Sequence, residues 1–206
     1  MARDNVAPTK SALLRTKERL ALAEEGHELL DQKREILVRE LMALVRPVQE
    51  QEDRMGARAA QAYRSLDRTL SAAGWTGTVD LAAMAAVDYR WTPGTEAKAG
   101  ISFPTLNLEV PQTGPLFSGT MGAVGAEETR RAFQELLAVA VPLAVVRAQV
   151  LRLSRELKKT QRRVNALEKI VIPQEEQTRD FIETVLEERD REAFFVTKLL
   201  KRRVSS

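Results

Sequence analysis

A repeat of 3.5 residues in the C-terminal part of this 206-residue chain constrains its fold more than any other feature. Alternating steps of four and three residues from Val139 to Leu199 give eighteen positions. Thirteen of these are apolar, against 44% of the whole chain. An apolar stripe with this period keeps facing one partner only when helices supercoil around each other with a left-handed twist. The repeat therefore predicts one helix of a coiled coil.

A less regular version of the same repeat runs through the N-terminal part of the chain. Leu13, Leu20 and Leu41 share one row of this repeat, and Leu30 and Leu37 share the companion row. Two such helices in one chain, joined by a short insert, pack most simply as an antiparallel pair. The expected fold class is therefore all-α dominated, a long antiparallel two-helix coiled coil with a small insert.

The start of the first helix and its glycine carry two further expectations. Thr9 or Ser11 is expected to cap the helix, directly after Pro8. Gly26 normally weakens a helix, but it is also expected to let the backbone of the partner helix come close.

Glycine and proline divide the chain into three parts. Eight of the ten glycines and four of the eight prolines lie between Gly74 and Gly125. Both residue types disfavour helix interiors, by about 1 and about 3 kcal/mol relative to alanine. One elongated domain is expected, with an N-terminal helix at 9–73, an insert of turns and short strands at 74–125, and a C-terminal helix at 126–204.

The insert shows two runs of alternating apolar residues. The first run is Val87, Tyr89 and Trp91, and the second is Leu106, Leu108 and Val110. Such alternation is typical of half-buried strands. The insert is therefore predicted to contain a β-hairpin, which turns either at 92–94 or near Gly100.

Composition excludes most catalytic chemistry. The chain has no cysteine and a single histidine, His27, which leaves little material for a thiol nucleophile, a zinc site or a histidine-based triad. Gly119, Gly122 and Gly125 precede the second helix but lack the Gly-Lys-Ser/Thr ending of a phosphate-binding loop. No catalytic, metal-binding or cofactor-binding residue is predicted.

Charge and hydropathy set the expected partners and location. The chain has 32 basic and 29 acidic residues, and this near balance is weak evidence for nucleic-acid binding. Its start lacks the apolar segment of a secretory signal. The apolar run from Leu136 to Val146 is shorter than the roughly 20 residues of a membrane span. A cytoplasmic protein without membrane insertion is therefore expected.

A basic cluster lies within the C-terminal helix. Four of its residues follow helical spacing along one stripe beside the apolar seam: Arg152, Arg155, Lys159 and Arg162. The stripe is either a solvated flank of the coiled coil, a contact for a protein partner or a surface for nucleic acid. Nucleic acid is the least favoured, because helices that bind it usually carry a more one-sided basic segment.

Two strings of the sequence resemble the D subunit of V-type and archaeal-type (V/A) rotary ATPases. The string KKTQRRVNALEKIVIP at 158–173 resembles the hallmark of this family, and PTKSALLRTKERLALAEEGHELLDQKREIL resembles its opening helix. Gly26 falls where the opening helix of the family has its glycine. The hallmark residues are Lys158, Lys159, Thr160, Arg162, Arg163, Val164, Asn165, Ala166, Leu167, Glu168 and Pro173.

The resemblance implies a role without catalysis or cofactor. The D subunit of these ATPases is the central shaft of the rotor and transmits torque between the ATP-binding catalytic hexamer and the ion-translocating membrane ring. The expected partners are the catalytic and regulatory subunits of the hexamer, the small F subunit of the rotor and the funnel-like C subunit. The expected location is the cytoplasmic side of the membrane, as a peripheral subunit.

Under this interpretation the basic residues are candidate contacts with the acidic surface of the stator. These candidates are Arg152, Arg155, Lys159, Arg162, Arg163, Lys198, Lys201, Arg202 and Arg203. Two hypotheses concern the shaft itself. Pro47, Pro142 and Pro173 kink it, and polar residues of the seam fix its register, namely Thr160, Gln174 and Thr178.

The alternative functions are a stand-alone coiled-coil adaptor and a basic coiled-coil protein that binds nucleic acid.

Overall fold

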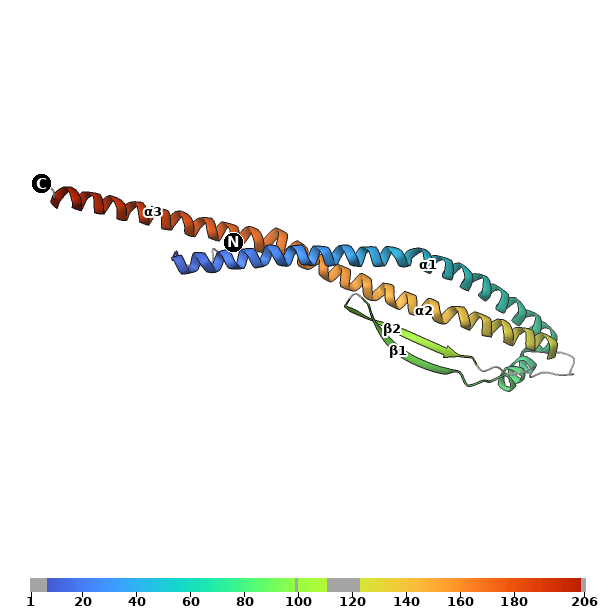
Figure 1. Ribbon diagram of the computed structural model, residues 1–206. Coiled ribbons are helices and arrows are strands. Elements are labelled where there is room, and N and C mark those ends of the chain that lie inside the picture. The colour runs from blue at the N-terminus through green and yellow to red at the C-terminus, as the bar shows by residue number, and fades with distance from the viewer. Residues whose placement is uncertain (1–6, 99, 111–122, 205–206) are drawn as a thin grey trace. The chain divides into compact units, whose positions relative to one another are not determined.

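The computed structural model describes residues 7–98, 100–110 and 123–204. Its elements are helix α1 (Lys10–Met84), strands β1 (Arg90–Lys98) and β2 (Ile101–Glu109), helix α2 (Ala123–Ala166), the π-helical turn η1 (Leu167–Val171) and helix α3 (Ile172–Val204) (Figure 1). Helix α2, η1 and α3 follow one another without a gap. The predicted fold class is confirmed: two long helical stretches flank a small antiparallel hairpin.

The chain forms two compact units. Residues 1–37 and 157–206 form the first, called the terminal unit below, and residues 38–156 form the second, called the hairpin unit. In each unit, residues nearer the C-terminus of α1 contact residues nearer the N-terminus of the partner helix. Lys17 and Gly26 lie against Glu183 and Leu167 in the terminal unit. The helices of each unit are therefore antiparallel.

Helix α1 begins and bends at residues whose chemistry accounts for both events. The Thr9 hydroxyl accepts a hydrogen bond from the Ala12 amide at 3.1 Å, as an N-cap residue does. Gly74 has φ 69° and ψ 176°, a conformation that is open almost only to glycine, and it interrupts the helix. Helix resumes from Trp75 to Met84, so the expectation of turns and strands directly after residue 74 is wrong. The end of this segment, Leu81–Met84, consists of strong helix formers, although Gly77 and two threonines precede it.

The packed seam of the terminal unit follows the predicted repeat as far as Leu167. Val164 is 1% exposed and Leu37 of α1 is equally buried. Thr160, one of the polar residues predicted to lie in the seam, is 2% exposed. Its burial agrees with a place in the seam and not with a place in solvent.

Beyond Leu167 the seam moves by one residue, and three of the predicted positions are wrong, whereas Thr178 and Val185 of the same stripe are half-buried. Val171, Gln174 and Phe181 were expected to face α1, but they are exposed. Their neighbours Ile172 and Glu175 are half-buried, and Ile182 is fully buried. The cause is η1, in which the Ile172 amide donates to the carbonyl of Leu167, five residues back instead of four. The additional residue shifts the phase of everything that follows.

The hairpin unit contains the predicted strands, with two differences. β1 and β2 pair antiparallel from Arg90↔Glu109 to Lys98↔Ile101, and Gly100, at φ 73°, lies in the turn. The alternative turn at 92–94 is wrong, because these residues lie within β1. Gly94 faces Thr105, whose hydroxyl would lie 2.7 Å from an added Cβ, so a glycine is needed inside the strand.

The edges of the hairpin also differ from the expectation. Val87 and Tyr89 precede β1, and Val110 follows β2. On β2, Phe103 is buried while Leu106 and Leu108 are half-buried, so the buried side changes parity along the strand. A single alternating pattern in the sequence could not show this change.

Prolines inside the helices do not end them. Pro47 lies within α1 and Pro142 within α2, and both helices continue through these positions. Pro173 is the second residue of α3, directly after η1.

One helical stretch is long and apolar enough to cross a membrane, by length and composition only. It lies within Gly125–Arg203, and 17% of its most apolar window is buried in the part of the chain that the structure describes. The sequence analysis counted only the uninterrupted apolar run at 136–146, and that count missed the longer, interrupted apolar stretch. Core helices of soluble proteins, which are mostly buried, pass the same test, so one such stretch is weak evidence for a membrane span.

Replacement of Gly26 by alanine is predicted to stabilise the protein. A Cβ built at Gly26 would lie 4.0 Å from Leu167 Cδ1, which is an ordinary contact, and the nearest atom belongs to a side chain. Gly26→Ala should therefore raise the free energy of unfolding by about 0.5–1 kcal/mol, the difference between the two residues in a helix. Chemical denaturation followed by circular dichroism measures it.

Gly74→Ala is the matched control. Apart from the adjoining backbone, no atom of the described residues lies within 4 Å of a Cβ at this position, so the expected cost comes from the backbone conformation. Because φ is 69°, we expect a loss of about 1–3 kcal/mol. Equal effects of the two substitutions would contradict the difference in backbone conformation.

Candidate functional site

The predicted basic stripe does not act as one surface, because Arg152 is engaged within the hairpin unit. Its Nη1 donates to the carbonyl oxygen of Ser102 at 2.5 Å and so ties α2 to β2. Arg155, one turn further along the helix, is exposed and forms no hydrogen bond or ion pair with a described residue. Arg152 therefore positions the hairpin, while Arg155 stays available for a partner.

The basic residues of the hallmark string lie on the outside of the terminal unit. Lys159, Arg162 and Arg163 are exposed, and among residues 7–98, 100–110 and 123–204 they have no hydrogen-bond or ion-pair partner. Thr160 and Val164, which directly follow Lys159 and Arg163, are buried at the seam. One segment thus packs on α1 with one side and presents three cations with the other.

The basic residues at the end of α3 lie in its last turns. Lys198, Lys201, Arg202 and Arg203 are exposed, and basic residues at a helix C-terminus interact favourably with the helix dipole. Lys201 has an interaction within the chain, whereas the other three make no hydrogen bond or ion pair with the described residues. These three are therefore the better candidates for a partner contact.

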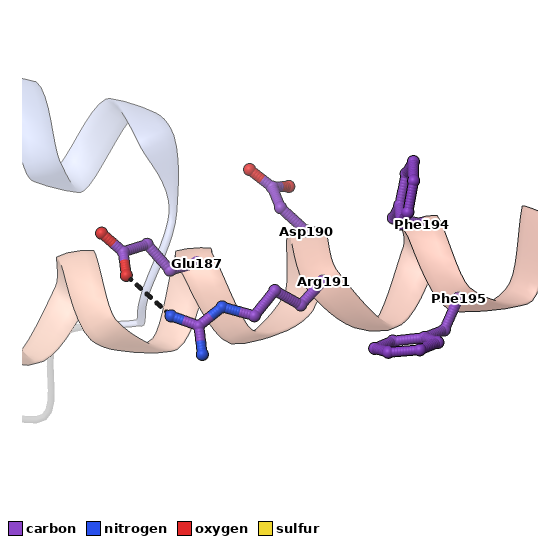
Figure 2. A pocket seen from close by; sticks show the side chains of 5 residues that line it. All are labelled: Glu187, Asp190, Arg191, Phe194 and Phe195. Carbon is purple, nitrogen blue, oxygen red and sulfur yellow. Dashed lines mark hydrogen bonds and ion pairs between the residues drawn. The ribbon is translucent and has the colours of Figure 1, made fainter.

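Sequence reasoning missed an apolar surface beside this cluster. Phe194, Phe195 and Leu199 are 68%, 63% and 61% exposed. Figure 2 shows both rings projecting from α3 beside a shallow pocket, where Arg191 reaches back to Glu187 at 3.1 Å. Arg189 donates to the carbonyl of Pro8 at 3.1 Å, and every described side chain from there to residue 203 is exposed.

A signal for this surface was present in the lengths of the predicted helices. The C-terminal helix at 126–204 is longer than the N-terminal helix at 9–73, so an antiparallel partner cannot cover its end. The repeat continues through this end with Phe195 and Leu199. The structure leaves these residues without cover from the described part of the chain.

Ion pairs cross the seam in both units. In the terminal unit, Lys17 Nζ lies 2.6 Å from Glu183 Oε1, and Arg19 Nη2 lies 3.1 Å from Glu175 Oε2. The hairpin unit has three pairs between α1 and α2 at 2.6–3.1 Å: Glu52–Arg147, Arg58–Glu135 and Arg68–Glu128. Exposed pairs contribute only about 0–1 kcal/mol each, so they act mainly by setting which residues face each other.

A largely covered arginine lies near the start of α2. The side chain of Arg130 is 9% exposed, pairs with Glu127 at 2.5 Å and donates to Gln134 Oε1 at 3.1 Å. The hydrogen bond to Glu127 raises the pKa of Arg130; burial opposes this, and the negative charge of Glu127 reinforces it. Arg130 thus stays charged and forms an ion pair within α2.

The described residues offer no metal site. No three of their histidine, cysteine, aspartate and glutamate side chains are grouped to hold an ion. His27 is half-buried on α1. Gly119 and Gly122, which were considered for a phosphate loop, lie outside the described residues.

Comparison with known proteins defines the class to which this arrangement belongs. The chain belongs to the family of ATP synthase D subunits, whose pattern matches residues 12–202. The resemblance drawn from the two sequence strings is thereby confirmed.

Individual relatives match over nearly their whole length. The V-type ATP synthase D subunit 2 of Treponema pallidum (strain Nichols) is 40% identical over 198 residues, 96% of this chain and 95% of the relative. The V-type ATP synthase D subunit of Thermotoga neapolitana is 30% identical, with 98% and 99% covered. The A-type ATP synthase D subunit of Methanosphaera stadtmanae is also 30% identical, with 98% and 95% covered.

Loss of the Arg152 side chain is predicted to loosen the hairpin. Arg152→Ala removes the hydrogen bond to Ser102, and a bond of this kind at an exposed site contributes about 1 kcal/mol. Hydrogen exchange of the β2 amides should then be about fivefold faster. Exchange followed by mass spectrometry measures this rate.

Arg155→Ala is the control, since it removes the same charge without a bond to the hairpin. Its β2 amides should exchange at the rate of the parent protein. Acceleration by both substitutions would mean that the charge, and not the hydrogen bond, holds the hairpin.

Proposed function

We propose that this chain is the central-stalk rotor shaft of a V/A-type rotary ATPase. In this role it transmits torque between an ATP-binding catalytic hexamer and an ion-translocating membrane ring, without catalysing a reaction itself. Membership of the family of ATP synthase D subunits supports the proposal. The observation that carries it is the continuous seam in each unit, where two antiparallel helices are joined by packing and by ion pairs.

A packed seam suits a component under torsion. Twisting one helix against the other would expose Leu143, Leu153 or Ala62, each no more than 2% exposed in the hairpin unit. Each large apolar side chain that is moved into water costs about 1.5–3 kcal/mol. The two helices of a unit therefore resist relative rotation and turn together.

The proposed partners follow from the family. They are the catalytic and regulatory subunits of the hexamer, the small F subunit of the rotor and the funnel-like C subunit at the membrane ring. The protein would then lie on the cytoplasmic side of the membrane as a peripheral subunit, without membrane insertion and without nucleic acid. Purification of the assembled complex with this chain as bait tests these partners, and recovery without ATPase subunits would favour a stand-alone adaptor.

The outward cations are proposed as sliding contacts with the stator. They are Arg155, Lys159, Arg162, Arg163, Lys198, Arg202 and Arg203, whose side chains are exposed. Shallow ion pairs are weak and screened by salt, so they can form and break at each angle of rotation. The kinks at Pro47, Pro142 and Pro173 remain a proposal for how the shaft acquires an asymmetric profile.

A disulfide within the shaft is predicted to leave rotation intact. The hydroxyls of Thr69 on α1 and Thr129 on α2 lie 2.9 Å apart, and the chain has no cysteine of its own. Thr69→Cys with Thr129→Cys should form a disulfide on oxidation and stabilise the protein by about 4 kcal/mol in the chain-entropy model. If both helices turn as one body, ATP hydrolysis by the assembled complex is unchanged.

The reduced double variant and each single cysteine variant serve as controls for this experiment. A loss of coupled hydrolysis on oxidation, restored by reduction, would show that the two helices move against each other during the cycle. That result would contradict a shaft that turns as a rigid pair.

Charge reversal in the hallmark string is predicted to weaken coupling. Arg162→Glu with Arg163→Glu should reduce ion pumping per ATP severalfold, because the new charges repel an acidic stator surface. Arg54→Glu is the control, since Arg54 is also exposed and has no ion pair among the described residues. Unchanged coupling and assembly in the double variant would refute these contacts.

A further inference from the structure

The heptad stripe of the C-terminal helix continues past residue 171, but the structure turns it away from α1. Leu167 and the stripe residues before it face the seam. Val171 and Phe181 of the same stripe are 36% and 49% exposed. Ile182, one residue further along, is completely buried instead. The helix after residue 171 therefore has two apolar stripes, of which only one faces α1.

The π-helical turn η1 separates the two phases. Ala166 before it and Ile172 after it have ordinary right-handed helical angles, at φ −69° and ψ −40° and at φ −58° and ψ −52°. The whole change is thus confined to Leu167–Val171, where one residue more than an α-helix requires is accommodated. One residue corresponds to about 100° of rotation about the helix axis.

Each stripe could form a seam with α1. In the observed register, Ile172, Ile182 and Leu186 lie toward α1, and Val185 lies at the edge of the seam, half-buried like Leu186. If η1 became a regular α-helical turn, the positions one residue earlier would replace them, namely Val171, Phe181 and Val185. Both sets are apolar and of similar size, so apolar burial alone discriminates weakly between the two registers.

Polar contacts favour the observed register. Glu175 reaches Arg19 at 3.1 Å and Glu183 reaches Lys17 at 2.6 Å. In the alternative register Gln174 and Ile182 would occupy these two places, and both ion pairs would be lost. The observed register is thus the more stable one, by a margin that rests on two ion pairs whose side chains are exposed or half-buried and which contribute little individually.

Pro173 opposes the alternative register through the backbone. In a regular α-helix the amide of residue 173 would donate to the carbonyl of Lys169, but proline has no amide hydrogen and its ring crowds that carbonyl. The π-helical turn directly before Pro173 avoids this arrangement. Removal of the proline should therefore favour the regular turn.

We propose that η1 and Pro173 form a register switch in the terminal unit. The switch interconverts two packings of the same sequence, which differ by one residue and by about 100° in the direction that α3 presents to its surroundings. With η1 closed to an α-helical turn, Val171 and Phe181 face α1, and Ile172 and Ile182 face outward. The switch is a property of the helices themselves and goes beyond the proposed rotary role.

Cross-linking of cysteine pairs by a short homobifunctional maleimide in the full-length chain distinguishes the two registers, because the chain has no cysteine. Arg19→Cys with Glu175→Cys reports the observed register, in which the ends of these two long side chains lie 3.1 Å apart. The reagent spans the distance that the shorter cysteine side chains leave, which a direct disulfide between them need not bridge. Arg19→Cys with Gln174→Cys reports the alternative. Deletion of Lys169, an exposed residue inside η1, provides the control. It removes the additional residue of the π-helical turn, so a regular α-helix then keeps the seam residues before and after η1 facing α1 in the observed register.

The expected result is a rapid cross-link at 19–175 and a slower one at 19–174 in the full-length chain. Pro173→Ala should raise the rate of the 19–174 cross-link at least threefold. Deletion of Lys169 should abolish the 19–174 cross-link and preserve the one at 19–175. The proposal is overturned if 19–174 forms no faster in the full-length chain than in the deletion variant, if Pro173→Ala leaves its rate unchanged, or if 19–175 fails to form.

Discussion

The apolar seam between antiparallel helices is the interaction on which the rest of the structure depends. In the terminal unit it buries Leu37 and Val164, and in the hairpin unit it buries Leu143 and Ala62. Two helices have little other shared surface, so residues away from the seam are exposed to solvent or to partners. The scarcity of aromatic residues, 5% of the chain, fits this geometry, because leucine, valine and alanine fill a two-helix interface without large rings.

The polar contacts refine what the seam establishes. Ion pairs such as Lys17–Glu183 and Arg147–Glu52 fix which residues of the two helices face each other. Arg152 joins the hairpin to α2 through the Ser102 carbonyl. These contacts are exposed and individually weak, so their value lies in choosing between packings of similar apolar burial. The π-helical turn is the place where this choice is closest, because the sequence there supplies two apolar stripes.

The exposure of a candidate site residue was predictable where helical spacing alone sets it. It was not predictable where a contact with a residue distant in the sequence sets it. The basic residues of the hallmark string are outward-facing because Thr160 and Val164 beside them form the seam, and their helical spacing already indicated this. Arg152 has the same spacing, but its partner lies fifty residues away on β2. The exposed Phe194 and Phe195 were missed because burial by an antiparallel helix was assumed to the end of the repeat, although the predicted helix at 9–73 is already too short to cover it.

The sequence by itself determined the class of fold, the antiparallel order, the presence of a hairpin between the helices and the family. These follow from local periodicity, from the distribution of glycine and proline, and from continuous strings of residues. Only the tertiary structure decided the phase of the seam after Leu167, the turn at Gly100 instead of 92–94, and the use of Arg152 within the chain. Each of these depends on which atoms of a distant segment come within reach, such as Thr105 opposite Gly94 or Arg19 opposite Glu175. A periodic pattern gives the spacing of side chains along a regular helix. It does not show where a π-helical turn such as η1 accommodates one additional residue and so changes which side chains face the seam.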